Sequence, residues 1–207
     1  MVAIDFECLE GANPAKFGYF VALWQGNQIM SLSDAKEIQS INNTTQDGSF
    51  VFENLSIDNL DYTIGFGVDL KDSSTICSTL LIPKGTKLYD TLTSVPTTLE
   101  LIEQSTNSLI AKFKAPLFTT PNMDKNWIAL FEGQFTSNIY SGINLVKLIR
   151  VPNNTNKGEV VMNDIPGGLI VDQHYTLVYG MGTNNSQNNK TESAVAATVF
   201  RVPPRRN

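Results

Sequence analysis

The sequence predicts an all-β chain made of two similar β-sandwich domains, and two observations lead to this prediction. The first is internal similarity: Val2 to Gly26 matches Leu109 to Gly133 without a gap, at an offset of 107 residues. The second is periodicity, because short runs of alternating apolar and polar residues are separated by Gly, Pro, Asn and Asp clusters, and helical periodicity is almost absent. A repeat of this length indicates one supersecondary plan used twice.

Length and composition fit two globular domains. The 207 residues contain 42% hydrophobic and 17% charged residues, which argues against disorder. We expect a first repeat at 1–85, a linker at 86–96 and a second repeat at 97–207. Each repeat is long enough to bury its own core without a metal or a disulfide.

Both repeats can be assigned strand by strand. The second repeat is expected to form seven strands, at 98–103, 109–115, 127–132, 145–151, 159–163, 175–181 and 195–202. The first repeat has counterparts of the last six, at 2–8, 20–25, 37–41, 49–53, 62–68 and 76–82. The counterpart of strand 98–103 is missing, so we expect an uncovered sheet edge along the strand at 2–8.

Two stretches carry a resemblance to a known family. The sequence Asn54 to Ile64 resembles the approach to the sixth strand of fibronectin type III domains, and Asp164 to Leu177 is similar. The resemblance is to the fibronectin type III or immunoglobulin-like architecture and points to no specific activity. It implies that Tyr62 and Tyr175 form tyrosine corners, in which the ring packs on the core and the hydroxyl donates to an upstream backbone carbonyl.

Aromatic residues in the predicted strands are assigned to the core. Phe6 and Phe113 stand where many domains of this family carry a tryptophan on the second strand. Trp24 and Trp127 lie in apolar strands, which favours packing over ligand contact.

The cysteines and the start of the chain bear on its compartment. Cys8 and Cys77 both fall in the first repeat, and we expect reduced thiols, with Cys8 pointing inward. The sequence at Met1 shows no signal-peptide pattern, and no apolar run is long enough to span a bilayer. These features predict a cytoplasmic protein, with release by a route that uses no signal peptide as the alternative.

Charge and motifs exclude several function classes. The net charge is about −7 up to Gly85 and about +2 after it, which disfavours nucleic-acid binding by the first repeat. His174 is the only histidine, and no metal-ligand, phosphate-loop or nucleophile-elbow motif occurs. We therefore expect no enzyme activity, no metal and no cofactor.

The first functional hypothesis is a binding or assembly protein. The open edge at 2–8 would accept a strand from a second copy of the chain, giving a homodimer or larger assembly, or from another protein. Asp5 and Glu7 align with Lys112 and Lys114, and all four side chains should point outward. These four residues are the predicted interface, in which the two faces dock on each other within a chain or between chains. The alternative is that both strand faces are charged only to stay soluble.

The second hypothesis is a carbohydrate or host-surface binder, lectin-like or toxin-associated. Amide side chains in Asn-rich loops can both donate to and accept from sugar hydroxyls, and exposed aromatic residues would add a stacking face. The candidate binding residues are Phe17, Tyr19, Phe135, Tyr140, Asn153, Asn154, Asn184 and Asn185.

Overall fold

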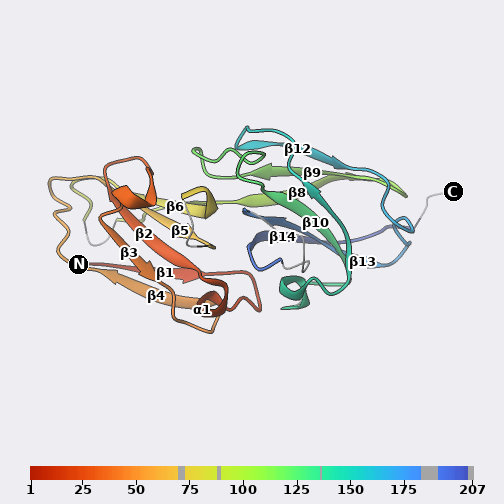
Figure 1. The fold of residues 1–207 in the computed structure, drawn as a ribbon, viewed down its shortest axis with the longest axis horizontal. Coiled ribbons are helices and arrows are strands. Elements are labelled where there is room, and N and C mark those ends of the chain that lie inside the picture. The colour runs from red at the N-terminus through yellow and green to blue at the C-terminus, as the bar shows by residue number, and fades with distance from the viewer. Residues whose placement is uncertain (70–72, 88–89, 136, 183–190, 205–207) are drawn as a thin grey trace. The chain divides into compact units, whose positions relative to one another are not determined.

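The computed structural model describes residues 1–69, 73–87, 90–135, 137–182 and 191–204 (Figure 1). The chain divides into two compact units, Met1–Pro96 (domain 1) and Thr97–Asn207 (domain 2). Both are built from antiparallel sheets, which confirms the predicted fold class. Residues Ser94–Pro96, expected in the linker, form a short strand that pairs with the preceding strand of domain 1.

Domain 2 is a complete sandwich of the fibronectin type III kind. Its described residues form a three-stranded sheet in the order β12-β9-β8 and a four-stranded sheet in the order β11-β10-β13-β14. The inward side chains of both sheets make the core. The elements are β8 (Thr98–Gln104), β9 (Leu109–Lys114), β10 (Trp127–Glu132), η3 (Ser137–Ser141), β11 (Leu145–Arg150), β12 (Lys157–Met162), β13 (His174–Gly180) and β14 (Ala194–Arg201).

Domain 1 follows the same plan without one edge strand. Its described residues form a two-stranded sheet, β1-β4, and a five-stranded sheet in the order β3-β2-β5-β6-β7. β1 and β4 correspond to β9 and β12, and the described residues of domain 1 contain no counterpart of β8. The elements are β1 (Val2–Glu7), α1 (Pro14–Phe17), β2 (Phe20–Gln25), η1 (Leu32–Asp34), β3 (Glu37–Ser40), β4 (Asp47–Phe52), β5 (Tyr62–Gly67), η2 (Ser73–Thr75), β6 (Ile76–Ile82) and β7 (Ser94–Pro96).

The two cores place the same aromatic types in opposite order. Phe20 and Trp24 of β2 correspond to Trp127 and Phe131 of β10, and both tryptophans are fully buried as predicted. A Cβ built on Gly65 of β5 would lie 3.0 Å from Cζ3 of Trp24, so the glycine makes room for the larger ring. Domain 2 has the smaller Phe131 and carries Val178 at the position of Gly65.

Both predicted tyrosine corners are present, with the hydrogen bond reversed. The Tyr62 hydroxyl accepts from the backbone N–H of Ser56 at 3.1 Å, and the Tyr175 hydroxyl accepts from the N–H of Ile170 at 3.2 Å. The expectation that the hydroxyl donates to a carbonyl is wrong, because the backbone group that faces each ring is an N–H, which can only donate.

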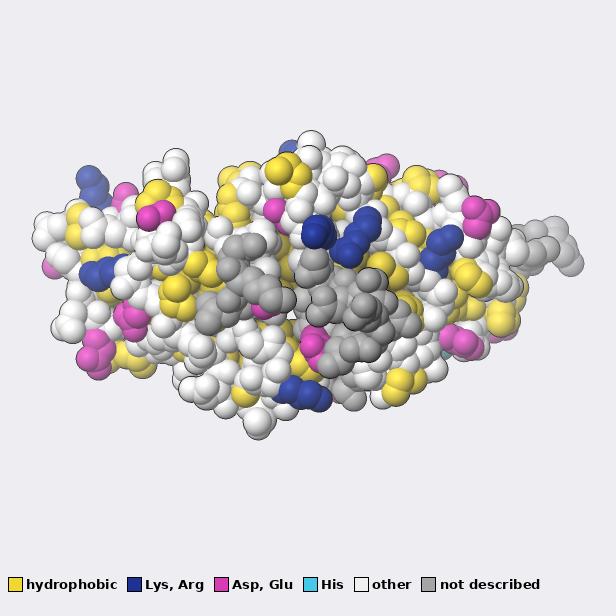
Figure 2. Space-filling model, viewed as in Figure 1, with side chains coloured by type: hydrophobic (Ala, Val, Ile, Leu, Met, Phe, Trp, Pro, Cys, Tyr) yellow, Lys and Arg dark blue, Asp and Glu magenta, His cyan; other side chains and the backbone are white. Residues whose placement is uncertain are grey.

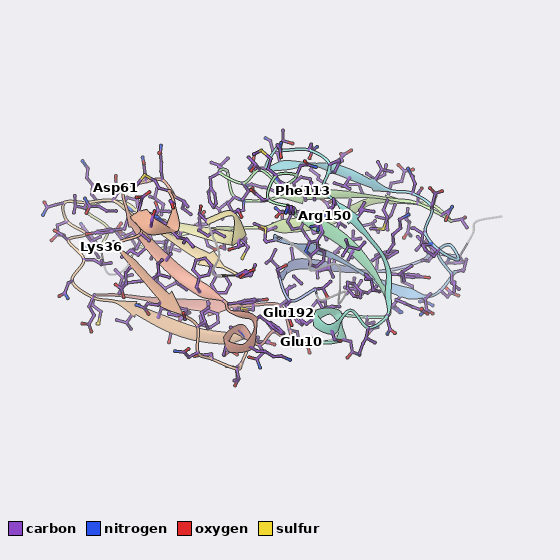
Figure 3. The ribbon with its side chains drawn as sticks, in the orientation of Figure 1. Glu10, Lys36, Asp61, Phe113, Arg150 and Glu192 are labelled. Atoms are coloured by element: carbon purple, nitrogen blue, oxygen red, sulfur yellow. The ribbon has the colours of Figure 1, made fainter. Side chains whose placement is uncertain are left out.

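A buried amide ties β10 to β13 in domain 2. The Asn126 side chain is fully buried, its Nδ2 donates to the Tyr179 hydroxyl at 3.0 Å, and its Oδ1 accepts from the Gly182 N–H at 3.0 Å. Its backbone carbonyl also accepts from the N–H of Val151. Nearby, the Arg150 guanidinium donates to the backbone carbonyl of Lys125 (Arg150 is labelled in Figure 3).

Both cysteines of domain 1 are free thiols. Burial, aided by the charges of Asp47 and Glu7, raises the pKa of Cys8 to about 12. Cys77 is buried, its thiol lies 3.5 Å from the carbonyl oxygen of Phe66, and burial likewise raises its pKa. Both side chains are therefore neutral at physiological pH.

Candidate protein-binding edge of domain 1

The strongest candidate site is the edge of β1 that faces away from β4. Among the described residues β1 pairs with β4 alone, from Val2 opposite Phe52 to Glu7 opposite Asp47. Figure 1 shows these two strands side by side. In domain 2 the matching strand β9 pairs on both sides, with β12 and with β8. The edge that β8 covers in domain 2 is thus without a strand in domain 1.

The register identifies which backbone groups face this edge. The N–H of Cys8 donates to the carbonyl of Gln46 at 2.8 Å, so the even-numbered residues of β1 direct their backbone groups to β4. Ala3, Asp5 and Glu7 therefore present their N–H and C=O groups to the open side. We call these three residues the β1 edge.

The counterparts of the β1 edge in domain 2 show how its backbone N–H and C=O groups could be paired. Ile110, Lys112 and Lys114 occupy the matching positions on β9. Lys112 lies opposite Glu100, and Lys114 lies opposite Thr98, both on β8. Domain 2 thus provides, within the same chain, a template for the missing strand.

The apolar face of β1 is only partly covered. Phe113 of β9 is 1% exposed, whereas its counterpart Phe6 is half-buried (Phe113 is labelled in Figure 3). The difference extends along the strand: Val2, Ile4, Phe6 and Cys8 are all half-buried, while Leu109, Ala111, Phe113 and Ala115 are buried. An additional strand with inward apolar side chains would bury more of this surface.

Phe6 is the largest apolar side chain of this face. Its ring centroid lies 5.2 Å from that of Phe50 and 5.7 Å from that of Phe66. It also lies over Gly48 of β4, since a Cβ built on Gly48 would be 2.7 Å from the Cε1 atom of Phe6. The half-buried ring is therefore held in a defined position at the open side of the sandwich.

The outer face of β1 and β4 is acidic. Asp5, Glu7 and Asp47 are all exposed, and Glu7 lies directly opposite Asp47. Like charges directly opposite each other across strands are unfavourable. Asp5 and Glu7 are exposed, in agreement with their predicted outward orientation. The prediction does not include Asp47, because the predicted strand begins at residue 49, whereas β4 begins at Asp47.

Domain 2 carries the opposite charge at the same positions and balances it at the central one, Lys112. Lys112 is exposed and lies between Glu100 of β8 and Glu159 of β12. Lys114, also exposed, lies opposite Lys157. The face drawn in Figure 2 carries charged side chains of both signs scattered among polar and apolar ones.

The prediction that Tyr19, before β2, is an exposed aromatic contact must be corrected. Tyr19 is 1% exposed, and Phe17 is half-buried, with the two ring centroids 6.0 Å apart. The one-turn helix α1 explains this burial: Asn13 caps its start, and Gly18, with φ of 72°, ends it and turns the chain back to the core. Tyr19 is therefore a core residue and offers no exposed contact.

Of the two aromatic candidates after β10, Tyr140 needs the same correction. Tyr140 is 5% exposed, and Phe135 is half-buried. Tyr140 lies in the short helix η3, which also buries Ile139. A connection that forms a helical turn can direct its large side chains inward, and alternation alone does not reveal this.

The Asn-rich loop of domain 2 is exposed and is hydrogen-bonded to the connection between β9 and β10. Asn153 and Asn154 are both exposed. The Oδ1 of Asn154 accepts from the N–H of Met123 at 3.0 Å, and the carbonyl of Asn153 accepts from the N–H of Asn122 at 3.1 Å. The other two candidates, Asn184 and Asn185, lie outside the described residues.

The described part of the chain offers neither a cluster of metal ligands nor a membrane-spanning helix. No group of three or more His, Cys, Asp or Glu side chains there could hold a metal ion. None of the helices in that part is both long and apolar enough to cross a bilayer.

The strand order and the two tyrosine corners define the chain as two fibronectin type III-like β-sandwich domains. No protein-family model and no curated protein sequence matches the chain. Among solved structures, it is similar to a DUF3823 family protein from Bacteroides ovatus, with 12% identity over 98% of this chain and 100% of that one, at a TM-score of 0.39.

Two other solved structures illustrate the range of this similarity. The FN1-FN3 domains of chicken CNTN1 share 8% identity over 93% of this chain, at a TM-score of 0.32, and this chain covers 55% of that one. A β-glucuronidase from Bacteroides uniformis shares 8% identity over 96% of this chain and 25% of its own, at a TM-score of 0.25.

Proposed function

We propose that this chain is a non-enzymatic binding or assembly protein that accepts an extended strand from another protein molecule along the β1 edge. The observation that carries the proposal is the contrast between β1 and β9, two matched strands of which only β9 is paired on both sides. Strand addition satisfies free backbone groups and buries alternate side chains. The donor is a second copy of the chain or a different protein.

The half-buried apolar face supports the same proposal. Three inward side chains, Val2, Ile4 and Phe6, retain exposed surface that their counterparts in domain 2 have lost. A donated strand with apolar side chains at alternate positions would cover them, as Leu99 and Leu101 of β8 do opposite Phe113 and Ala111. Backbone pairing and apolar burial would then stabilise the complex together.

The carbohydrate alternative has weaker support in the geometry. A sugar site commonly joins amide groups to an exposed aromatic face, and Tyr19 and Tyr140, two of the aromatic candidates, are buried. The exposed amide of Asn154 already has a backbone partner, the N–H of Met123 in the connection between β9 and β10. We therefore place strand binding first, and a glycan array is the separate test of the alternative.

The test uses a proline at the β1 edge. Asp5→Pro removes an N–H that faces the open side and leaves the β1–β4 bonds in place, whereas proline at Phe6 would break a bond to β4. The probe is a fluorescent peptide that copies β8 with Glu100→Thr, which makes it neutral at the position facing Asp5. We expect the peptide to bind the full chain and to bind Asp5→Pro at least tenfold more weakly.

Two controls accompany this measurement. Lys112→Pro places the same substitution at the matched position of β9, which is paired on both sides, and should lower the free energy of unfolding by about 2–4 kcal/mol. Asp5→Pro should cost less than about 1 kcal/mol, since proline is tolerated at open edges. Light scattering after size exclusion measures the molar mass in parallel, and its dependence on concentration over about a hundredfold range reports self-association. A monomer that binds no β8-derived peptide would refute the proposal.

A further inference from the structure

The acidic outer face beside the β1 edge restricts which strand can dock there. Any strand that pairs with β1 in the register of β8 places its outward side chains next to those of Asp5 and Glu7. These two carboxylates and that of Asp47 are exposed on the same face. An acidic donor would bring further negative charge to a face that already holds one like-charged cross-strand pair.

Self-pairing through β1 meets the same difficulty. Two copies joined along their β1 edges would bring Asp5 and Glu7 of one copy beside Asp5 and Glu7 of the other. Four carboxylates would then share one exposed face, with Asp47 of each copy next to them. Like charges on neighbouring positions of paired strands are unfavourable, so the charge pattern disfavours a second β1 as the occupant.

Domain 2 shows the charge relation that a third strand can supply. There the central residue Lys112 has opposite charges on both sides, Glu100 of the edge strand and Glu159 of β12. In domain 1 the central residue Asp5 has Ser49 on one side and no described strand on the other. The central residue is negative in domain 1 and positive in domain 2. We therefore expect the strand beside Asp5 to carry a positive residue where β8 carries Glu100.

We propose that the β1 edge selects an extended segment of a different protein, in which apolar residues alternate with lysine or arginine. This inference rests on the proposed function and adds the chemistry of the partner to it. The apolar side chains would cover Ile4 and Phe6, and the basic side chains would lie beside Asp5 and Glu7. Basic residues at these positions convert a repulsive face into a balanced one.

The test compares two β8-derived peptides that differ only in charge. The basic peptide carries Thr98→Lys and Glu100→Lys, and the acidic peptide carries Thr98→Glu and keeps Glu100. At each of the two positions, attraction strengthens binding and repulsion weakens it, each by about twofold. The basic peptide should therefore bind on the order of tenfold more tightly than the acidic peptide. The preference should shrink when the salt concentration rises to about 0.5 M.

A charge-reversed variant provides the matched control. Asp5→Lys combined with Glu7→Lys installs the residue type that domain 2 carries at these exposed positions, and it should prefer the acidic peptide instead. Equal binding of both peptides, lost in Asp5→Pro, would overturn the charge selection and leave strand binding standing. A dimer that Asp5→Pro dissociates would overturn the choice of partner, and failure of every peptide to bind a monomer would overturn both proposals.

Discussion

Alanine at Gly48 should destabilise domain 1, although the same change at the matched Gly158 should not destabilise domain 2. A Cβ on Gly48 would lie 2.7 Å from Cε1 and 2.9 Å from Cζ of Phe6, and it would overlap the amide of Asn43. A Cβ on Gly158 would meet its nearest neighbour at 3.4 Å and Cε1 of Phe113 at 3.6 Å. One chain therefore contains both the crowded and the open version of the same site.

The expected magnitudes differ in sign. Overpacking in a well-filled region costs about 1–3 kcal/mol, and Phe6 cannot move freely because its ring also contacts Phe50 and Phe66. Gly158 has no positive φ, so alanine there should add about 0.5 kcal/mol by restricting the unfolded chain. The two variants should differ by about 2–3 kcal/mol, or on the order of 10 °C in Tm for domains of this size.

The assay uses the fact that each domain contains one tryptophan. Trp24 reports on domain 1 in a Trp127→Phe background, and Trp127 reports on domain 2 in a Trp24→Phe background, each background being compared with its own glycine parent. Urea unfolding followed by fluorescence gives both free energies of unfolding. If Gly48→Ala stays within about 0.5 kcal/mol of its parent, Phe6 is not packed against Gly48 and the reasoning is wrong.

Three further predictions concern other parts of the fold. Tyr62→Phe should lower the urea stability of domain 1 by about 1 kcal/mol, because it removes the acceptor of a backbone N–H; no change would contradict the corner geometry. Asn126→Ala should cost domain 2 about 2–4 kcal/mol in the same assay, since the Tyr179 hydroxyl and a backbone N–H lose their partner; a loss below about 1 kcal/mol would count against it. Cys8, whose pKa burial raises from 9.0 to about 12, should resist thiol reagents at pH 8 until the chain unfolds. The free energy that the neutral Cys8 thiol contributes to folding is complete below pH 9.0 and is lost as the pH rises toward 12. Cys8→Ala, which installs the residue that domain 2 has at the matched position 115, should reduce this loss of stability.

Much of the architecture could be predicted from the sequence, because strand signals are local. The alternation of apolar and polar residues located the strands of both domains except β7. The gapless match aligned β1 with β9. Comparison of the two copies also showed that β8 has no counterpart among the described residues of domain 1. The tyrosine corners were found from residue type and spacing, but the direction of their hydrogen bond depends on which backbone group faces the ring.

The candidate site could be predicted only in part, because burial in connections depends on tertiary packing. Tyr19 and Tyr140 lie in segments without strand periodicity, and short helices direct both side chains inward. The predicted acidic face does not include Asp47, because the sequence does not reveal that β4 begins at this residue. Which backbone groups point to the open edge follows from the pairing register, and no single strand sequence contains that information.

The exchanged order of phenylalanine and tryptophan in the two cores has a consequence for grafting between the domains. β10 carries a tryptophan where β2 has Phe20 and a phenylalanine where β2 has Trp24, and the facing strands have adapted through Gly65 and Val178. Transplanting β2 alone into domain 2 would force the larger ring against a valine, while β2 and β5 moved as a pair would bring their own complementary volume. We therefore expect the two repeats to be interchangeable by strand pairs and not by single strands, because β2 and β5 have complementary volumes.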